Sequence, residues 1–441
     1  MESAQQAADN IGEGHAVETA AGAPVSREDR IESLDFIRGL AVMGILAANI
    51  IAFGQPFSAY MWPDGFLVPD GDPDGWMWIA QFVLIDGKMR GLFTLLFGAG
   101  LYLFMERAWA RGQTRWLQAR RLFWLGLFGL FGLIHYFVIW RGDILFYYAA
   151  IGFVVLLTLG WRARDQLVFG ILGYIAGAIT YALMMVPLAL VADTGLGDNA
   201  AFTETRDGLT AGKQAVLNDN ARLTEFMQSG DFVGLVAYRI ETHWYEPIGN
   251  LMLFGLETLP LMLMGVALYR MGMFSGEFDR KELRLWGWLG VIVGGGFYFA
   301  IGLWTQAGGF TYYGTLAAIF GMSPLPRLAM VMGLAALLVL YAPNATGWLG
   351  DRIRAAGRAA FTNYLGTSVL MMFVFHGWAL GLFGELNRPQ LYIVVVATWL
   401  IMLAWSKPWL ERFRYGPLEW LWRCLTYGRL FPLKRQETHS G

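Results

Sequence analysis

Long apolar runs recur along the chain and alternate with shorter polar segments. Each run has about 20 residues, which is long enough to cross the hydrocarbon core of a membrane as an α-helix. A soluble helical protein would carry polar outer faces, and these runs lack them. We therefore predict an all-α, polytopic helical membrane protein with about ten transmembrane helices. The predicted spans are 36–55, 86–105, 120–140, 143–160, 166–192, 248–269, 284–305, 326–342, 360–384 and 390–406.

These spans divide the chain into five regions. Residues 1–30 are rich in Ala, Gly, Glu and Gln and predict a disordered cytoplasmic tail. Transmembrane helices follow in 31–192 and again in 248–408. Between them, 193–247 is a polar segment that predicts one or two helices on the outer face. Residues 409–441 are aromatic and basic, and they predict an interfacial helix and a tail.

Composition supports this class, and charge sets the orientation. The chain is 56% hydrophobic and only 15% charged. Most Lys and Arg residues fall in the segments that lie on the same side as the N-terminus, so the positive-inside rule predicts that both termini are cytoplasmic. The single cysteine, Cys424, excludes an internal disulfide and a multi-cysteine metal site. We expect no metal and no resident cofactor.

The first span carries a polar stripe. Arg38 and Asn49 are eleven residues apart, close to three helical turns, so they share a face with Asp35, Val42 and Ile45. Polar groups on a membrane helix are costly unless they face the protein interior or a water-filled cavity. The stripe therefore predicts that this helix lines a site.

Several blocks of sequence resemble the YeiB-like family of bacterial polytopic membrane proteins. The blocks are LDFIRGLAVMGILAANI (34–50), TLLFGAG (94–100), HYFVIWRGDILFYYAAIG (135–152), GRAAFTNYL (357–365) and FRYGPLEWLWRCLTYG (413–428). The resemblance implies a multi-pass protein of the bacterial plasma (inner) membrane. It also implies a distant relationship to transmembrane acyltransferases such as heparan-glucosaminide N-acetyltransferase.

The mark shared with those acyltransferases is an Arg on the first span followed eleven residues later by a polar residue. Here the pair is Arg38 and Asn49. Relatives of the Asn type carry a catalytic His a further eleven residues on, whereas this chain has Tyr60 at that position. If the reaction is acyl transfer, its general base must come from elsewhere.

The third predicted span supplies one candidate base. His135 near its outer end could act as a general base, with Asp143 orienting it. Arg121, at the inner end of the span, lies near the same helix face. The alternatives stay open: His135 could be a hydrogen-bonded interhelical residue, and Asp143 could pair with Arg141 at the membrane surface.

Other polar residues in the spans are further candidates for substrate binding. Lys88 and Arg90, next to Asp86, open the second span from outside, where they could dock a substrate or extend to the interface. His376 lies at a depth comparable with that of Asn49 and could bind substrate or only pack. Glu257, in mid-span, is costly if unpaired, so it could have a structural partner such as Lys88 or Arg90, or it could handle protons.

Two functions fit this pattern. The first is acyl transfer: the phosphates of an acyl-CoA co-substrate bind near Arg38 and Arg121, and an acceptor binds in the outer half. Asp35 is a further candidate for substrate or cofactor binding, or it forms an ion pair with Arg38 that fixes the start of the first span. His135 would then deprotonate a hydroxyl or amine, and Asn49 would stabilise the oxyanion. The alternative is a transporter of a small metabolite or drug-like compound. Expected partners are the lipid bilayer and a small-molecule or envelope-glycan acceptor, with no nucleic acid; a homo-oligomeric state stays open.

Overall fold

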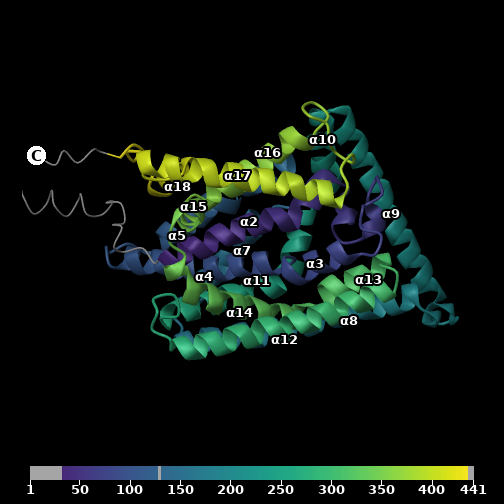
Figure 1. Cartoon of the computed structure of the whole chain (residues 1–441), viewed down its shortest axis with the longest axis horizontal. Helices are drawn as coiled ribbons and strands as arrows, with labels where there is room; N and C mark the ends of the chain where they lie inside the picture. The colour runs from purple at the N-terminus through teal and green to yellow at the C-terminus, as the bar shows by residue number, and fades with distance from the viewer. Residues whose placement is uncertain (1–31, 128–130, 436–441) are drawn as a thin grey trace, which may run out of the picture.

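The computed structural model describes residues 32–127 and 131–435, which form helices and no strand. Most of the helices lie roughly along one long axis, and α9 (Thr203–Ser229) runs across it (Figure 1). One end, the inner end, carries α5 (Arg115–Leu122), α15 (Trp348–Arg358) and α18 (Pro417–Tyr427) and is predicted to face the cytoplasm. The opposite, outer end carries α9, α10 (Phe232–His243) and α13 (Tyr312–Leu316). The disorder predicted for 1–30 lies outside the described residues.

The apolar runs form helices, and the predicted class of polytopic helical membrane protein is confirmed. Six helices are long and apolar enough to cross a membrane. They are α2 (Glu32–Gly54), α8 (Ala163–Asp193), α11 (Glu246–Arg270), α12 (Arg280–Ala307), α14 (Pro324–Tyr341) and α17 (Arg388–Arg412). Three other predicted spans correspond to α4 (Lys88–Trp109), α7 (Leu145–Thr158) and α16 (Ala360–Phe375). The number of ten spans stays a prediction.

The predicted span 120–140 is not one regular helix in its described parts. It begins in α5 (Arg115–Leu122), continues as a π-helical turn, η3 (Phe123–Leu127), and resumes as α6 (Gly132–Ile134) and a second π-helical turn, η4 (His135–Ile139). A π turn holds more residues than an α turn and therefore changes which side chains share a face. This matters for the placement of His135.

Close approach of helices builds the centre of the bundle. Helix α2 lies inside it and packs against α4, α15, α16 and α17. Helices α4 and α11 cross at two glycines: a Cβ on Gly98 would lie 2.1 Å from the Met262 carbonyl oxygen, and one on Gly265 would lie 1.9 Å from that of Leu95. Only glycine permits this contact, in agreement with the close packing expected of small residues on membrane helices.

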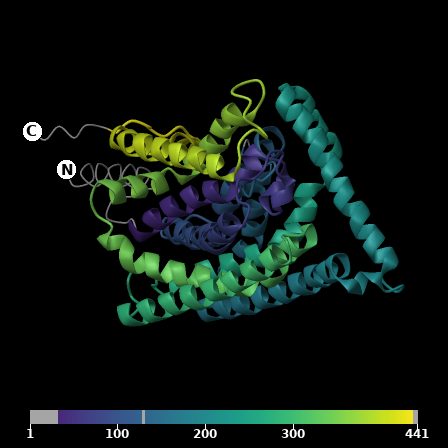
Figure 2. The ribbon, with the colours of Figure 1, turned by 45° about the vertical axis from the view of Figure 1, so that its right-hand side comes forward.

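The outer end is covered by two helices from the 193–247 segment, α9 (Thr203–Ser229) and α10 (Phe232–His243). Figure 2 shows α9 as a long rod across that end of the bundle. Gly230, with φ 77°, ends α9, and the Asp231 side chain caps α10 by accepting the Gly234 N–H. The remaining outer elements are α3 (Trp76–Leu84), α13 (Tyr312–Leu316), η1 (Phe57–Tyr60), η2 (Pro63–Gly65), η5 (Gly195–Asp198) and η6 (Ala317–Met322).

The inner end is closed by α15 (Trp348–Arg358), η7 (Ala342–Asn344) and the C-terminal α18 (Pro417–Tyr427). Helix α18 is fixed by Glu419, whose carboxylate accepts the backbone N–H groups of Phe361 (2.8 Å) and Thr362 (3.1 Å) at the start of α16. Trp422 donates its indole N–H to the Arg121 carbonyl, 2.9 Å away. The predicted interfacial segment thus also forms part of the inner-end structure.

Candidate functional site: two cavities along α2

A cavity of about 320 Å³ opens among α2, α4, α5, α15, α16 and α18 at the inner end. Apolar and aromatic side chains, including Phe93, Phe97 and Phe361, form part of its wall. It is also strongly cationic, since six arginines line it: Arg38, Arg107, Arg111, Arg121, Arg358 and Arg423. The one carboxylate among its described lining residues, that of Glu419, accepts hydrogen bonds from the backbone N–H groups at the start of α16. This inner cavity therefore favours an anionic ligand.

Two residues of α5, Arg121 and Gln118, present polar groups to the inner cavity. The Arg121 guanidinium lies between the rings of Phe104 (4.5 Å) and Trp422 (4.2 Å), and none of the described residues forms an ion pair with it. Gln118 is fully buried, and neither its amide nitrogen nor its oxygen has a hydrogen-bond partner within the described parts of the chain. Burying an unsatisfied amide is costly. A ligand in the cavity would satisfy it.

A second cavity, of about 360 Å³, lies in the outer half. Asn49 of α2 lines it, together with Tyr60, Asp86, Arg90 and Asp143. Its walls are aromatic and aliphatic elsewhere, so a few polar groups converge in an apolar enclosure, as is typical of ligand sites. The polar stripe of the first span thus reaches both cavities, Arg38 in the inner one and Asn49 in the outer one.

A thin aromatic partition separates the two cavities. Tyr148 lines the outer cavity, and its ring contacts Phe93 (centroids 5.9 Å apart) and Phe97 (5.1 Å), which line the inner one. The Tyr148 hydroxyl is hydrogen-bonded to that of Thr94. On another side of the partition, Tyr364 of the inner cavity donates to Asp143 of the outer cavity, 3.2 Å away.

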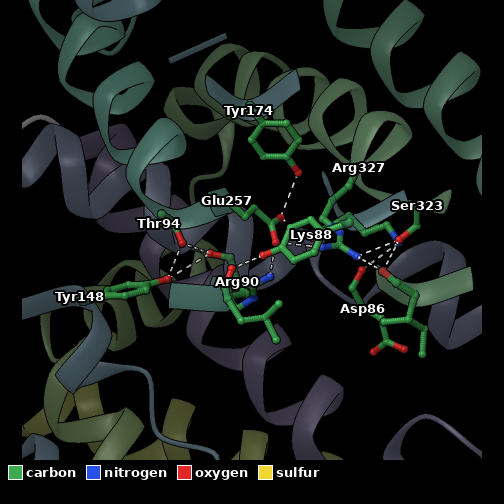
Figure 3. A network of polar contacts seen from close by, with 12 residues as sticks. Asp86, Lys88, Arg90, Thr94, Tyr148, Tyr174, Glu257, Ser323 and Arg327 are labelled. Atoms are coloured by element: carbon green, nitrogen blue, oxygen red, sulfur yellow. Dashed lines mark hydrogen bonds and ion pairs between the residues drawn. The ribbon is translucent and has the colours of Figure 1, made fainter. Parts of the chain in front are cut away.

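A buried charge network borders the outer cavity (Figure 3). Glu257 of α11 is 3% exposed and accepts hydrogen bonds from Arg90, from Arg327 of α14 (3.0 and 3.1 Å) and from the Tyr174 hydroxyl of α8 (3.0 Å). Arg327 also donates to the Tyr298 hydroxyl, 3.0 Å away. The expected partnership of Glu257 with Arg90 is confirmed. The network joins five helices beside the site.

Lys88 does not line the outer cavity. Its ammonium donates to the backbone carbonyls of Phe82 and Asp86 and lies 3.2 Å from the centroid of the Tyr298 ring. The side chain is fully buried, and the contacts of its nitrogen among the described residues are with these groups of the protein. Arg90 is different, because its guanidinium lines the cavity while one of its nitrogens bonds Glu257.

His135 lies behind the outer cavity wall. Its Nδ1 is 2.8 Å from an Asp143 carboxylate oxygen, so Asp143 does orient it, but His135 is 1% exposed and is absent from the cavity lining given by the described residues. Its Nε2 is buried without a hydrogen-bond partner in the described ranges. The structure therefore does not bring the imidazole next to Asn49, and its catalytic role stays a prediction.

The two remaining candidate residues lie outside the two cavities. Asp35 forms an ion pair with Arg38 (3.3 Å) one turn away on α2 and does not line the described wall of the inner cavity. His376, at the end of α16, lines a separate cavity of about 60 Å³ and packs against Phe232 and Trp378. The similar depth of His376 and Asn49 thus does not place them together.

Arg141 does not pair with Asp143; it holds the outer cap instead. Its guanidinium forms ion pairs with Glu246 and with Asp219 of α9 (3.1 Å). His243 of α10 bridges the same carboxylates, with its ring nitrogens 2.9 Å from Asp219 and from Glu246. Arg141 also lines both the outer cavity and a wider crevice of about 730 Å³ beneath α9. The cluster therefore borders both spaces at the outer end.

This cluster predicts that docking of the cap weakens in alkali. Burial opposes charge on His243, but the hydrogen bonds of His243 to Asp219 and Glu246 outweigh burial and raise the pKa of His243. Burial also opposes charge on Asp219, but His243 and Arg141 help to lower the pKa of Asp219 to about 2. The His243 contribution is complete below its unfolded value of about 6.5 and is lost as the pH rises through the raised pKa. Amide exchange in α9 and α10, corrected for intrinsic rates, should be faster at pH 9 than at pH 6.5. His243→Gln should remove that difference; if the variant keeps it, the assignment is wrong.

Several lining residues are not identified by the sequence alone. They are Arg107, Arg111, Gln118, Arg358 and Arg423 in the inner cavity, and Tyr148, Asn250 and Arg327 in the outer one. The basic residues of 106–121 carry a signal, but it is indistinguishable from the positive-inside pattern. Packing of α5 against α4 and α18, and of α15 against α2, places the arginines and Gln118 around one cavity.

These features define a class: a helical membrane protein whose first span lines two cavities placed end to end, one of them arginine-rich. The chain belongs to the YeiB-like family. It is 32% identical over 415 residues to the Escherichia coli (strain K12) "Uncharacterized protein YeiB", covering 90% of this chain and 96% of that protein. The family model "Protein of unknown function (DUF418)" matches residues 268–429.

Two further relatives cover nearly the whole chain. "Uncharacterized protein YxaH" of Bacillus subtilis (strain 168) is 29% identical over 94% of this chain and 98% of its own length. "Uncharacterized 39.9 kDa protein in amylase 3'region" of Bacillus acidopullulyticus is 27% identical over 93% of this chain and 97% of its own length. No solved structure matches the chain.

Proposed function

We propose that the protein is a transmembrane acyltransferase of the bacterial plasma membrane. It would move an acyl group from a cytoplasmic acyl-CoA in the inner cavity to a hydroxyl or amine acceptor in the outer cavity. The observation that carries the proposal is the pair of cavities on α2, one arginine-rich and one holding Asn49, with only an aromatic layer between them. The resemblance at Arg38 and Asn49 agrees with it.

The inner cavity has the chemistry that a CoA thioester requires. Guanidinium groups pair well with phosphates, and six of them surround the opening. Phe104 and Trp422 hold Arg121 in position. The apolar wall beyond, at Phe93 and Phe97, leads toward the partition. A pantetheine arm placed there would bring its thioester close to Tyr148, at the border of the outer cavity.

The outer cavity would hold the reacting centre. Arg38 and Asn49 are about 16 Å apart along the helix axis, so phosphates bound at the first leave an extended arm to reach the second. The Asn49 amide makes no side-chain hydrogen bond with another described residue and lines the cavity, so it is free to donate to an oxyanion. The acceptor's oxygen or nitrogen attacks the thioester carbonyl, and the sulfur leaves as the thiol of CoA.

The test is acyl transfer by the purified full-length protein. Detergent-solubilised protein and proteoliposomes are incubated with labelled acetyl-CoA or longer acyl-CoAs and a cell-envelope extract. Thiol release and labelled product are followed. We expect both, and both should depend on the extract. The absence of both thiol release and labelled product, with every one of these donors, would overturn the proposal.

The same two cavities support a second candidate, a transporter of a small metabolite or drug-like compound. In that function the two cavities would be the access routes from either side to a site at the partition, which would open to one side at a time. Flux of a compound into sealed vesicles without any acyl donor would support transport, because it would show that the flux does not depend on acyl transfer. Dependence of product formation on acyl-CoA would favour the enzyme.

Loss of Arg121 should weaken donor binding. Arg121→Gln removes a guanidinium oriented by two aromatic rings, and a charged hydrogen bond contributes about 1.5–3 kcal/mol, so we expect acyl-CoA affinity to fall about tenfold or more. Equilibrium binding of CoA measures it. The control is Arg115→Gln on the same helix, where the side chain is exposed and outside the cavity. Equal effects of the two substitutions would contradict the assignment.

A further inference from the structure

The outer cavity lacks a histidine within its described lining, but it holds two carboxylates, those of Asp86 and Asp143. The Asp143 carboxylate is saturated. One oxygen faces His135 Nδ1 (2.8 Å) and the Tyr364 hydroxyl (3.2 Å), and the other accepts the N–H groups of Leu145 (2.9 Å) and Phe146 (3.2 Å) at the start of α7. Asp143 is 1% exposed, so it is occupied as a helix cap and a partition anchor.

Asp86 is not saturated. Its two carboxylate oxygens share a single donor, the amide nitrogen of Gln81, at 3.1 and 3.3 Å. The described residues form no ion pair with it, because the nearby Lys88 ammonium is bound to backbone carbonyls. Figure 3 shows the Asp86 carboxylate pointing away from the network that Glu257 organises. A buried carboxylate with unused acceptor positions therefore lines the cavity.

The single donor to Asp86 is itself held in place. Arg388, a fully buried residue at the start of α17, donates to the Gln81 side-chain oxygen at 3.1 Å. This bond directs the amide nitrogen of Gln81 toward Asp86. Gln81 and Arg388 thus fix the orientation of the carboxylate without neutralising it directly.

Tyr60, which also lines the cavity, cannot replace a histidine base. Burial and, to a smaller extent, the negative charge of Asp86 raise the pKa of its hydroxyl. Tyr60 therefore stays protonated and can only donate or relay a hydrogen bond near Asp86.

We propose that Asp86 is the general base of the reaction, with Gln81 and Arg388 as positioning residues. This inference rests on the acyl-transfer function proposed above. The Asp86 carboxylate takes the proton of the acceptor O–H or N–H while the acceptor forms its bond to the thioester carbon. The C–S bond then breaks, its electron pair leaves on sulfur, and the proton passes from Asp86 to the thiolate, which regenerates the carboxylate and releases the thiol of CoA.

The test compares Asp86→Asn with wild type using acetyl-CoA and the envelope extract. General acid–base catalysis contributes about 10²- to 10⁴-fold, so transfer should fall by that factor while CoA affinity and the unfolding temperature stay unchanged. Hydroxylamine, a nucleophile that needs little help from a base, should be acylated by Asp86→Asn at near the wild-type rate. A merely structural role for Asp86 would reduce both reactions. Asp86→Glu, which keeps a carboxylate, should retain part of the transfer rate, and the exposed outer-loop variant Asp64→Asn should retain all of it.

The outcomes separate the two proposals. If wild type transfers acetyl groups and Asp86→Asn does so equally well, Asp86 is not the base, but the acyltransferase function stands. Loss of hydroxylamine acylation or of CoA binding in Asp86→Asn would also overturn the role of Asp86. If wild type neither binds CoA nor forms product, the proposed function is wrong, and so is the role of Asp86 as its general base.

Discussion

Glu257→Ala should destabilise the helix bundle by about 3–5 kcal/mol, the usual cost of removing one partner from a buried ion pair. Glu257 is the common acceptor for Arg90, Arg327 and the hydroxyl of Tyr174. Without it, the buried guanidinium of Arg327 and the partly buried one of Arg90 lose the carboxylate that lies between them. A membrane interior offers little water to replace it.

Thermal unfolding in detergent, followed by the helical signal, measures this effect. The control is Glu282→Ala on α12, an exposed residue near the inner end, where we expect almost no change. A second variant, Glu257→Ala with Arg327→Met, removes one of the orphaned charges and should recover part of the loss. An unfolding temperature for Glu257→Ala equal to that of the control would show that the network contributes no net stability.

Much of the fold could be predicted because the bilayer imposes a length on each apolar run. The helices α2, α8, α11, α12, α14 and α17 begin and end within four residues of the predicted spans, except that α17 ends at Arg412, six residues after the predicted end at 406. Two spans differ more: α16 ends at Phe375, nine residues before the predicted end at 384, and the 120–140 run is not one regular helix. Its apolar residues satisfy the length rule, but η3 and η4 are π-helical turns, and a hydropathy pattern carries no information on such turns.

The same turns explain why the site was only partly predictable. Arg38 and Asn49 lie on a regular helix, so three turns of 3.6 residues place them correctly along one stripe. The expected alignment of His135 with Arg121 assumes that period through a segment that does not keep it. His135 consequently lies behind Asp143 and outside the described lining of the outer cavity.

Contacts between distant segments complete the site, and no local pattern encodes them. Arg141 pairs with Asp219, 78 residues further along, and not with the adjacent Asp143. Gln81 meets Arg388 across 307 residues. The sequence identifies Arg141 and Asp143 as candidates but not Asp219, Gln81 or Arg388, because the partner of each residue depends on how the helices pack.

Asn49→Ala should reduce acyl transfer by about 10²- to 10³-fold, the usual effect of removing one donor to an oxyanion. The reason is its place in the molecule: Asn49 lines the outer cavity, and its amide forms no side-chain hydrogen bond to another described residue that the substitution would break. The unfolding temperature should therefore change little. Donor affinity should also persist, because the arginines of the inner cavity begin at Arg38, about 16 Å away along α2.

The measurement is the rate of CoA release at saturating donor, together with CoA affinity, for Asn49→Ala and for Asn344→Ala. Asn344 is exposed at the inner end and serves as the matched control. A large loss of rate at unchanged affinity would locate the reacting carbonyl in the outer cavity, beyond the partition at Tyr148. A loss of CoA affinity without a loss of rate would contradict that location, since Asn49 would then contribute only to binding of the donor and not to the transition state. The cavity that holds Asn49 would then be a binding or transport compartment, and the chemistry would have to be sought among the arginines.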